Sequence, residues 1–143
     1  KDDPLQKKST LLAYILANRP EHFLQLAVGE ELLPCIDYHL MRSALRTGMV
    51  NVTNHDLQLQ IINRSMMSRE DEHSIRSAVY DAIRRLVDMP TTSLDMVSVD
   101  KFFFQMRRGC PEMTDPECEL CALDTVCAKD KGLFQPVIRT TYY

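Results

Sequence analysis

The chain has 143 residues, of which 45% are hydrophobic and 26% are charged, and its formal net charge is -3 at pH 7. This length and composition predict one globular domain, residues 1–143, and the charge excludes a protein that coats nucleic acid through a generally basic surface. The sequence contains nothing close to the roughly 18 consecutive apolar residues that a membrane-spanning helix needs, so we expect no membrane partner.

Apolar residues recur at helical spacing along most of the chain, and nothing before residue 110 alternates like a strand. Hydroxyl-to-acid capping patterns open two of the helices, at Thr53–Asp56 and Ser68–Asp71, and Asp37 lies at the cap position of a third. The sequence therefore predicts an all-α fold of about five to six helices, over residues 9–18, 21–33, 38–47, 53–66, 69–87 and 94–108.

Four cysteines lie close together in the C-terminal part, with the spacing C-x7-C-x2-C-x5-C: Cys110, Cys118, Cys121 and Cys127. Thiolates at such spacing can converge on one metal centre, and zinc and iron-sulfur clusters both accept four cysteines. Disulfides fit less well, because the fifth cysteine, Cys35, stands alone and no secretion signal is present. We expect a metal loop and a reducing compartment, the cytoplasm or, in a eukaryote, the nucleus.

A carboxylate and a small basic face lie together in the predicted helix that follows Pro34. Asp37 is placed to cap it, and Arg42 and Arg46 lie four residues apart, on one face. Arginine and lysine contribute affinity for nucleic-acid phosphates that does not depend on base sequence. The residues that we predict to contact phosphates are Arg42, Arg46, Arg107, Arg108, Lys129 and Lys131.

The order of these features resembles the C-terminal half of the helix-hairpin-helix DNA glycosylases of the endonuclease III type, over residues 34–131. In that family an Asp-x-His stretch begins a helix that carries two arginines four residues apart and then a threonine. Two further helices lead into C-x6-C-x2-C-x5-C, so only the first cysteine gap differs here, by one residue. The matching residues of the first motif are Asp37-Tyr38-His39, Arg42, Arg46 and Thr47.

The resemblance implies a [4Fe-4S] cluster on the four cysteines, with zinc as the alternative cofactor. It implies that Asp37 is the catalytic carboxylate and that Lys8, or Lys7 beside it, is the lysine of the members with AP-lyase activity. The expected function is base excision repair, in which a damaged or mispaired base is removed from DNA by cleavage of its N-glycosidic bond. DNA is then the expected partner.

The chain departs from the family in its N-terminal part, where the Leu-Pro-Gly-x-Gly hairpin is missing. The resemblance divides it into a remnant of the helical barrel side (1–33), the catalytic-Asp helix and the helices after it (34–109), the iron-sulfur loop (110–127) and a tail (128–143). We expect a missing N-terminal part or another chain to complete the barrel. Two alternatives stay open: a non-catalytic iron-sulfur module that binds nucleic acid, and a glycosidic hydrolase that acts on modified nucleosides.

Overall fold

The computed structural model describes residues 3–91 and 93–143, so Lys1, Asp2 and Thr92 lie outside the described residues. Within the described ranges there is one isolated parallel bridge, between Met66 and Val137, and no longer strand pairing, so the all-α fold class is confirmed. No helix in these ranges is both long and apolar enough to cross a membrane. The elements are α1 (Lys7–Asn18), α2 (Tyr38–Thr47), α3 (His55–Ile62), α4 (Arg69–Val87), α5 (Met96–Met106) and a short 3-10 turn, η1 (Cys118–Leu120).

Side chains cap the N-termini of four of these helices, which explains why the helices begin where they do. A capping oxygen accepts a hydrogen bond from an amide that has no partner inside the first turn. The start of α4 is confirmed, whereas α3 covers only His55–Ile62 of the predicted range 53–66, with Asn54 as its cap instead of Thr53. The capping bonds are Leu40 N to Asp37 Oδ1 at 2.9 Å, Leu57 N to Asn54 Oδ1 at 3.1 Å, Asp71 N to Ser68 Oγ at 3.0 Å and Ser98 N to Asp95 Oδ1 at 2.7 Å.

The helix predicted over residues 21–33 is not formed, and the chain runs there as a long loop with turns. Gly29 takes a left-handed conformation, with φ at 86°, which interrupts a helix. Phe23 and Val28 are exposed to solvent. The apolar stripe therefore has no surface to pack against, and packing is the main source of stability for a short helix.

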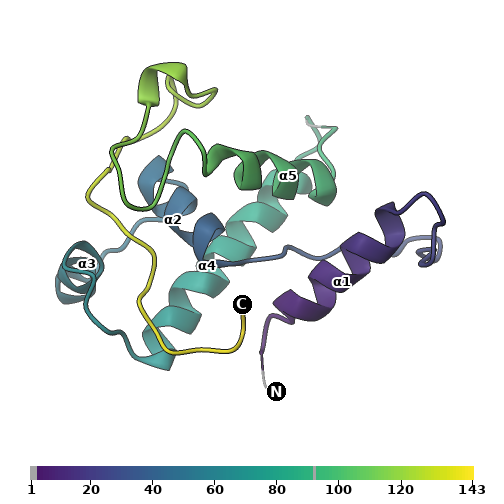
Figure 1. Cartoon of the computed structure of the whole chain (residues 1–143), viewed down its shortest axis with the longest axis horizontal. Coiled ribbons are helices and arrows are strands. Elements are labelled where there is room, and N and C mark those ends of the chain that lie inside the picture. The colour runs from purple at the N-terminus through teal and green to yellow at the C-terminus, as the bar shows by residue number, and fades with distance from the viewer. Residues whose placement is uncertain (1–2, 92) are drawn as a thin grey trace.

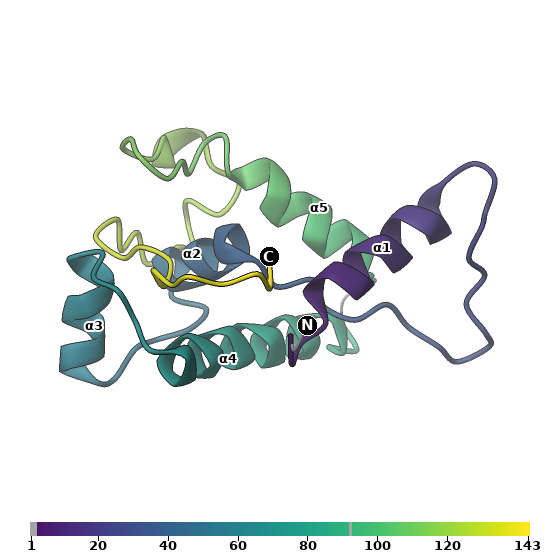
Figure 2. The ribbon, with the colours of Figure 1, turned by 60° about the horizontal axis from the view of Figure 1, so that its bottom comes forward.

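Helix α2 is the centre of the fold, and it packs against both α4 and α5 (Figures 1 and 2). Its apolar stripe is buried as predicted. The polar residues Arg42, Ser43 and Arg46, which lie on its other faces, are buried too. The buried apolar residues of α2 are Leu40, Met41, Ala44 and Leu45.

The first and last described segments meet on one buried arginine of α4 (Figure 1). Arg76 pairs with Asp3 at 2.9 Å and, inside its own helix, with Glu72 at 3.2 Å. The rings of Tyr142 and Tyr143 lie 5.0 and 5.7 Å from the same guanidinium, and the Tyr143 hydroxyl donates to Glu72 at 3.2 Å. This cluster compensates two charges inside the fold and fixes residues 3–6 next to α4.

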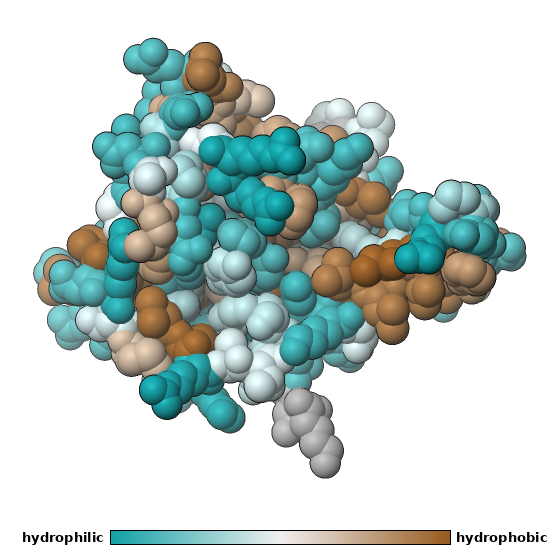
Figure 3. All heavy atoms as spheres, viewed as in Figure 1, coloured by the Kyte–Doolittle hydropathy of each residue, from teal (hydrophilic) through white to brown (hydrophobic). Residues whose placement is uncertain are grey.

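Helix α1 lies to one side of the body formed by α2, α4 and α5 (Figures 1 and 2). The Tyr14 hydroxyl donates to the carbonyl of Leu33 at 2.9 Å, which ties α1 to the segment that leads into α2. Leu12 and Ile15 on its outer face are exposed, and Figure 3 shows hydrophobic side chains gathered over this helix. The inner face of α1 therefore carries the contacts that position it.

The end of the cysteine loop docks on the C-terminus of α2. The amides of Ala128 and Asp130 donate to the carbonyls of Thr47 and Arg46 at 3.1 and 3.0 Å, which gives partners to two carbonyls of the last helical turn. Gly48 ends the helix with φ at 78°, and a Cβ at this position would lie 2.9 Å from the Cβ of Ala128. The helix end and the loop therefore fit together only with glycine at this position.

We expect Gly48→Ala to lower the free energy of unfolding by about 3 kcal/mol, because the left-handed backbone and the close contact both oppose a methyl group. Gly29→Ala is the matched control, since Gly29 has a similar φ of 86° with nothing within 4 Å of the added Cβ. Its cost should be about 1 kcal/mol. Urea unfolding of both variants measures the difference, and equal losses would show that the Ala128 contact contributes nothing.

Candidate functional site

A small pocket of about 90 Å³ brings together groups from α1, the start of α2 and α5. Asp37, the predicted catalytic carboxylate, lines it, as do the sulfur-bearing Cys35 and the imidazole of His39. The aromatic rings of Phe103 and Phe104 form an apolar wall. The pocket therefore places titratable groups against a hydrophobic surface. Such a surface disfavours the charged form of a group that lies against it, so the pKa values of groups in one pocket can differ from each other.

Asp37 is held by its role as the cap of α2. Its Oδ1 accepts from the amide of Leu40 at 2.9 Å, and the side chain is partly buried. The capping bond fixes the carboxylate at the positive end of the helix and leaves Oδ2 as the oxygen that can serve a substrate. The capping role and the predicted catalytic role are thus compatible in one geometry.

The lysine that lines this pocket is Lys7, not Lys8. Lys7 is partly buried in the first turn of α1, whereas Lys8 is exposed. Neighbouring residues in a helix point about 100° apart, so only one of the two can face the pocket. The structure thus brings Lys7, and not Lys8, next to Asp37, and a catalytic role for either lysine stays a prediction.

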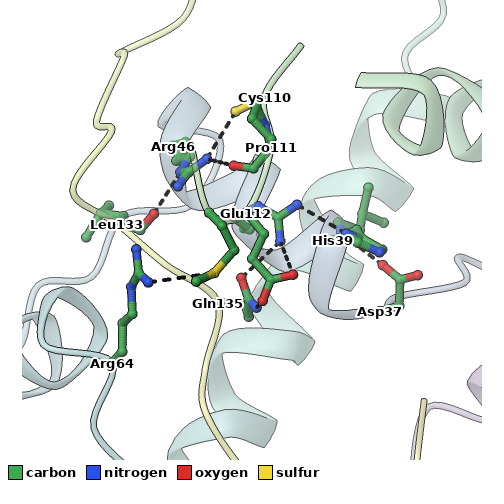
Figure 4. A network of polar contacts seen from close by, with 12 residues as sticks. Asp37, His39, Arg46, Arg64, Cys110, Pro111, Glu112, Leu133 and Gln135 are labelled. Carbon is green, nitrogen blue, oxygen red and sulfur yellow. Dashed lines mark hydrogen bonds and ion pairs between the residues drawn. The ribbon is translucent and has the colours of Figure 1, made fainter. Parts of the chain in front are cut away.

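A chain of polar contacts leads from His39 to the cysteine loop (Figure 4). Arg42 Nη2 lies 3.1 Å from His39 Nδ1, and since arginine only donates, Nδ1 accepts and the neutral ring carries its proton on Nε2. Burial, the largest influence, lowers the pKa of His39, while the Asp37 carboxylate opposes this. Arg42 Nη1 donates to Gln135 Oε1 at 3.0 Å, and Gln135 Nε2 donates to Glu112 at 2.8 Å.

Arg46 attaches the cysteine loop to α2 (Figure 4). Its Nη1 donates to the carbonyl of Pro111 at 2.7 Å and to Cys110 Sγ at 3.4 Å, and its Nε donates to the carbonyl of Leu133 at 2.9 Å. One buried guanidinium thus holds the segments on both sides of the cysteines against the helix.

Arg42 and Arg46 are not placed to contact phosphates, which corrects the expectation of a basic face on α2. They are 1% and 5% exposed, and both Nη atoms of Arg42 and the Nε and Nη1 atoms of Arg46 bind groups inside the protein, while Arg42 Nε is buried without a hydrogen-bond partner. Sequence spacing placed the two side chains correctly on one helix face, but that face is covered by residues 133–136 and by the cysteine loop.

The other predicted phosphate contacts lie on or near the surface. Arg107 is partly exposed and stacks on Phe104 with its guanidinium 3.8 Å from the ring centroid, so it lies at the rim of the pocket. Arg108 and Lys131 are exposed. Lys129 is also exposed, but it pairs with Asp124 at 2.7 Å, and this pairing raises its pKa.

All four clustered cysteines line one small cavity in the loop that contains η1. Amides point at two of the sulfurs, from Leu123 to Cys121 at 3.5 Å and from Lys129 to Cys127 at 3.3 Å, and Arg46 points at Cys110. Donors of this kind stabilise thiolates, so the donor set suits a four-cysteine site. All five cysteines are free, and no group of three or more His, Cys, Asp or Glu side chains in the described ranges has an arrangement that could hold a single ion.

One pocket residue was not predicted from the sequence. Asp100 lies on α5 and lines the pocket together with Phe103 and Phe104. The sequence signal was present, because Asp100 is the acid within an apolar helical stripe that includes Val99 and Phe103. Burial, the largest influence, raises the pKa of Asp100 to about 6, with the charge of Asp37 acting in the same direction.

A larger hollow of about 610 Å³ lies between α5, the C-terminal ends of α2 and α4, and the cysteine loop. Its walls include Met49, Leu94, Phe102 and Val126, and no charged side chain lines it. The hydroxyl groups of Thr47 and Ser98 and the thiol of Cys127 line this hollow with no acid or base beside them to activate a nucleophile. The smaller pocket is therefore the candidate for chemistry. Comparison with protein-family models, with curated proteins and with solved structures gave no match.

We expect Arg46→Met to lower the free energy of unfolding by roughly 3 kcal/mol, because the carbonyls of Pro111 and Leu133 would lose their buried donor. Methionine keeps much of the side-chain volume, so the loss reports hydrogen bonding and charge. Arg108→Met, at an exposed site, should change stability by no more than about 0.5 kcal/mol. Urea unfolding gives both values, and a wild-type midpoint for Arg46→Met would mean that other contacts hold the loop.

Proposed function

We propose that this chain carries the catalytic carboxylate and the iron-sulfur loop of a DNA N-glycosylase that removes a damaged or mispaired base. The observation that carries the proposal is that Asp37 and Lys7, from separate segments of the chain, line the same pocket. A carboxylate and a lysine side by side are the pair that the resemblance to the endonuclease III type leads us to expect. The helix that begins at Asp37 also holds the four-cysteine loop through Arg46, which supports the same proposal.

Asp37 acts on the sugar in this proposal. Cleavage of an N-glycosidic bond leaves positive charge on the anomeric carbon as the base departs, and a fixed carboxylate stabilises that charge. The same carboxylate can orient and deprotonate the attacking water. In an AP-lyase step Lys7 would be the amine that attacks the sugar, because it lines the pocket.

The cysteine loop would hold a [4Fe-4S] cluster on Cys110, Cys118, Cys121 and Cys127. The cluster, when bound, cross-links the loop and has a structural role. Arg46 and the amides that point at the sulfurs would stabilise the thiolate ligands, and the hydrogen bonds to Pro111 and Leu133 keep the loop on α2.

DNA contacts in the proposal come from the surface around the pocket. Arg107 lies at its rim on Phe104, and Arg108 and Lys131 are exposed. The burial of Arg42 and Arg46 leaves fewer cations for phosphates, which favours a free modified nucleoside as the second candidate substrate. The two candidates share the chemistry of Asp37 and differ only in substrate.

We expect Asp37→Asn to reduce base release at least about 100-fold, because the amide cannot stabilise the sugar cation by charge or take a proton. Asparagine caps a helix as well as aspartate does, so α2 should stay intact and the urea midpoint unchanged. Base release is measured on duplexes with a single uracil or thymine opposite guanine, or an adenine opposite 8-oxoguanine, and on the matching free nucleosides. Release by the variant at the wild-type rate would remove Asp37 from the mechanism.

The same duplexes distinguish the lysines. Borohydride should trap a covalent protein–DNA complex if an amine attacks the sugar, and Lys7→Ala should abolish the trapping while Lys8→Ala retains it. An active protein that is never trapped would use water as the nucleophile. If the protein releases the base from free nucleosides but not from duplexes, its substrate is the modified nucleoside and not DNA.

We expect protein purified without oxygen to be brown, with absorbance near about 400 nm, and to lose this colour when Cys118 or Cys121 is replaced by serine. Cys35→Ser is the control and should keep the colour. Cys35 is buried in the pocket with Asp37 and does not line the cavity of the four clustered cysteines, so it is not placed to bind the cluster. A colourless protein that contains zinc and no iron would overturn the assignment of an iron-sulfur cluster, while the four cysteines would remain the metal site.

A further inference from the structure

A second carboxyl group faces the proposed site from α5. Asp100, Phe103 and Phe104 share one face of this helix, since they are three and four residues apart, and all three line the pocket with Asp37. The pocket is only about 90 Å³, so a group that enters it meets both acids. Asp37 comes from the cap of α2 and Asp100 from the middle of α5, and the two therefore approach the pocket from different helices.

The surroundings of the two carboxyl groups differ. Asp37 caps a helix and accepts from an amide, whereas Asp100 lies among aromatic rings. Burial raises the pKa of Asp100 to about 6, the Asp37 charge adds to this, and the ammonium of Lys7 opposes it. Burial also raises the pKa values of Tyr14 and Cys35, so these two remain neutral. The charged and titratable groups around Asp100 are Lys7, Tyr14, Cys35, Asp37 and His39.

We propose that Asp100 is the general acid of this site and gives its proton to the departing base. The inference rests on the proposed N-glycosylase function and adds a catalytic residue to it. Paired carboxyl groups in unlike environments divide the work in this way, one as the charged group at the sugar and the other as the proton donor at the leaving group.

The bond between the anomeric carbon and the base nitrogen breaks, and its electron pair goes to the base, which takes the proton of Asp100. Water adds its oxygen to the anomeric carbon and gives a proton to the Asp37 carboxylate. That proton then passes to Asp100 directly or through solvent, so that the base leaves protonated, the sugar gains a hydroxyl group, and both acids return to their starting states.

The first arm of the test is independent of activity. Carbon NMR of protein with labelled aspartate carboxyl groups follows each titration, and Asp100→Asn identifies the Asp100 signal by its loss. We expect a midpoint near 6 in the wild type and a lower one in Asp37→Asn, because removal of the neighbouring negative charge favours ionisation. A midpoint near 4 in the wild type would overturn the inference.

The second arm measures single-turnover base release from the uracil, thymine and adenine duplexes between pH 5 and 8. The wild-type rate should fall about tenfold per pH unit above 6, as Asp100 loses its proton. Asp100→Asn should be about 100-fold slower at pH 5.5 and should lack this fall, because an amide transfers no proton. The exposed Asp81→Asn is the matched control and should follow the wild type.

The outcomes separate the two proposals. Asp100→Asn should fold, since it removes a charge from a partly buried site, and its thermal midpoint at pH 8 should equal or exceed that of the wild type. If the wild type and Asp100→Asn release base equally at every pH while Asp37→Asn does not, only the role of Asp100 is overturned. If the wild type releases no base from any duplex or nucleoside, the proposed function fails and the role of Asp100 fails with it.

Discussion

The burial of two arginines on the central helix is the constraint on which the rest of the structure depends. Arg42 and Arg46 lie four residues apart on α2, inside the protein, and a guanidinium cannot be buried without partners. Apart from His39 on the same helix, the partners come from the C-terminal part of the chain: Gln135 and Glu112 for Arg42, and three groups around the cysteines for Arg46. The cysteine loop and the segment after it must therefore lie on α2.

The same helix carries the candidate site at its other end. Asp37 is fixed by the first turn, while the last turn supplies carbonyls to the amides of Ala128 and Asp130. A helix of this length is rigid, so the carboxylate and the cysteine loop keep a defined separation and orientation. His39 and Arg42 add a chain of side-chain contacts between the two ends. The loop thereby braces the element that presents the carboxylate, even though none of its four cysteines lines the pocket.

The pocket also depends on how α1 is attached. Lys7 reaches it because α1 is tied to the rest of the fold by Tyr14, which donates to the carbonyl of Leu33, and by Asp3, which pairs with Arg76. The Cys35 thiol also lies 3.6 Å from the carbonyl of Lys7. Arg76 is buried and has Glu72 as its other acidic partner, so the contact is shielded from solvent and salt. The lysine, the capping carboxylate and Asp100 come from three different elements. The pocket consequently exists only in the complete tertiary fold, and its apolar wall of Phe103 and Phe104 gives the two acids their different environments.

The sequence by itself determined the local features. Capping residues set the beginnings of α2 and α4, the long apolar repeat predicted α4, and the cysteine spacing predicted four thiols around one cavity, because each of these depends on residues close together in the chain. Tertiary structure decided what covers each surface. It left residues 21–33 without a helix, buried Arg42 and Arg46, and turned Lys7 and Asp100 into the pocket, since a helical pattern shows which side chains share a face but not which neighbour that face meets.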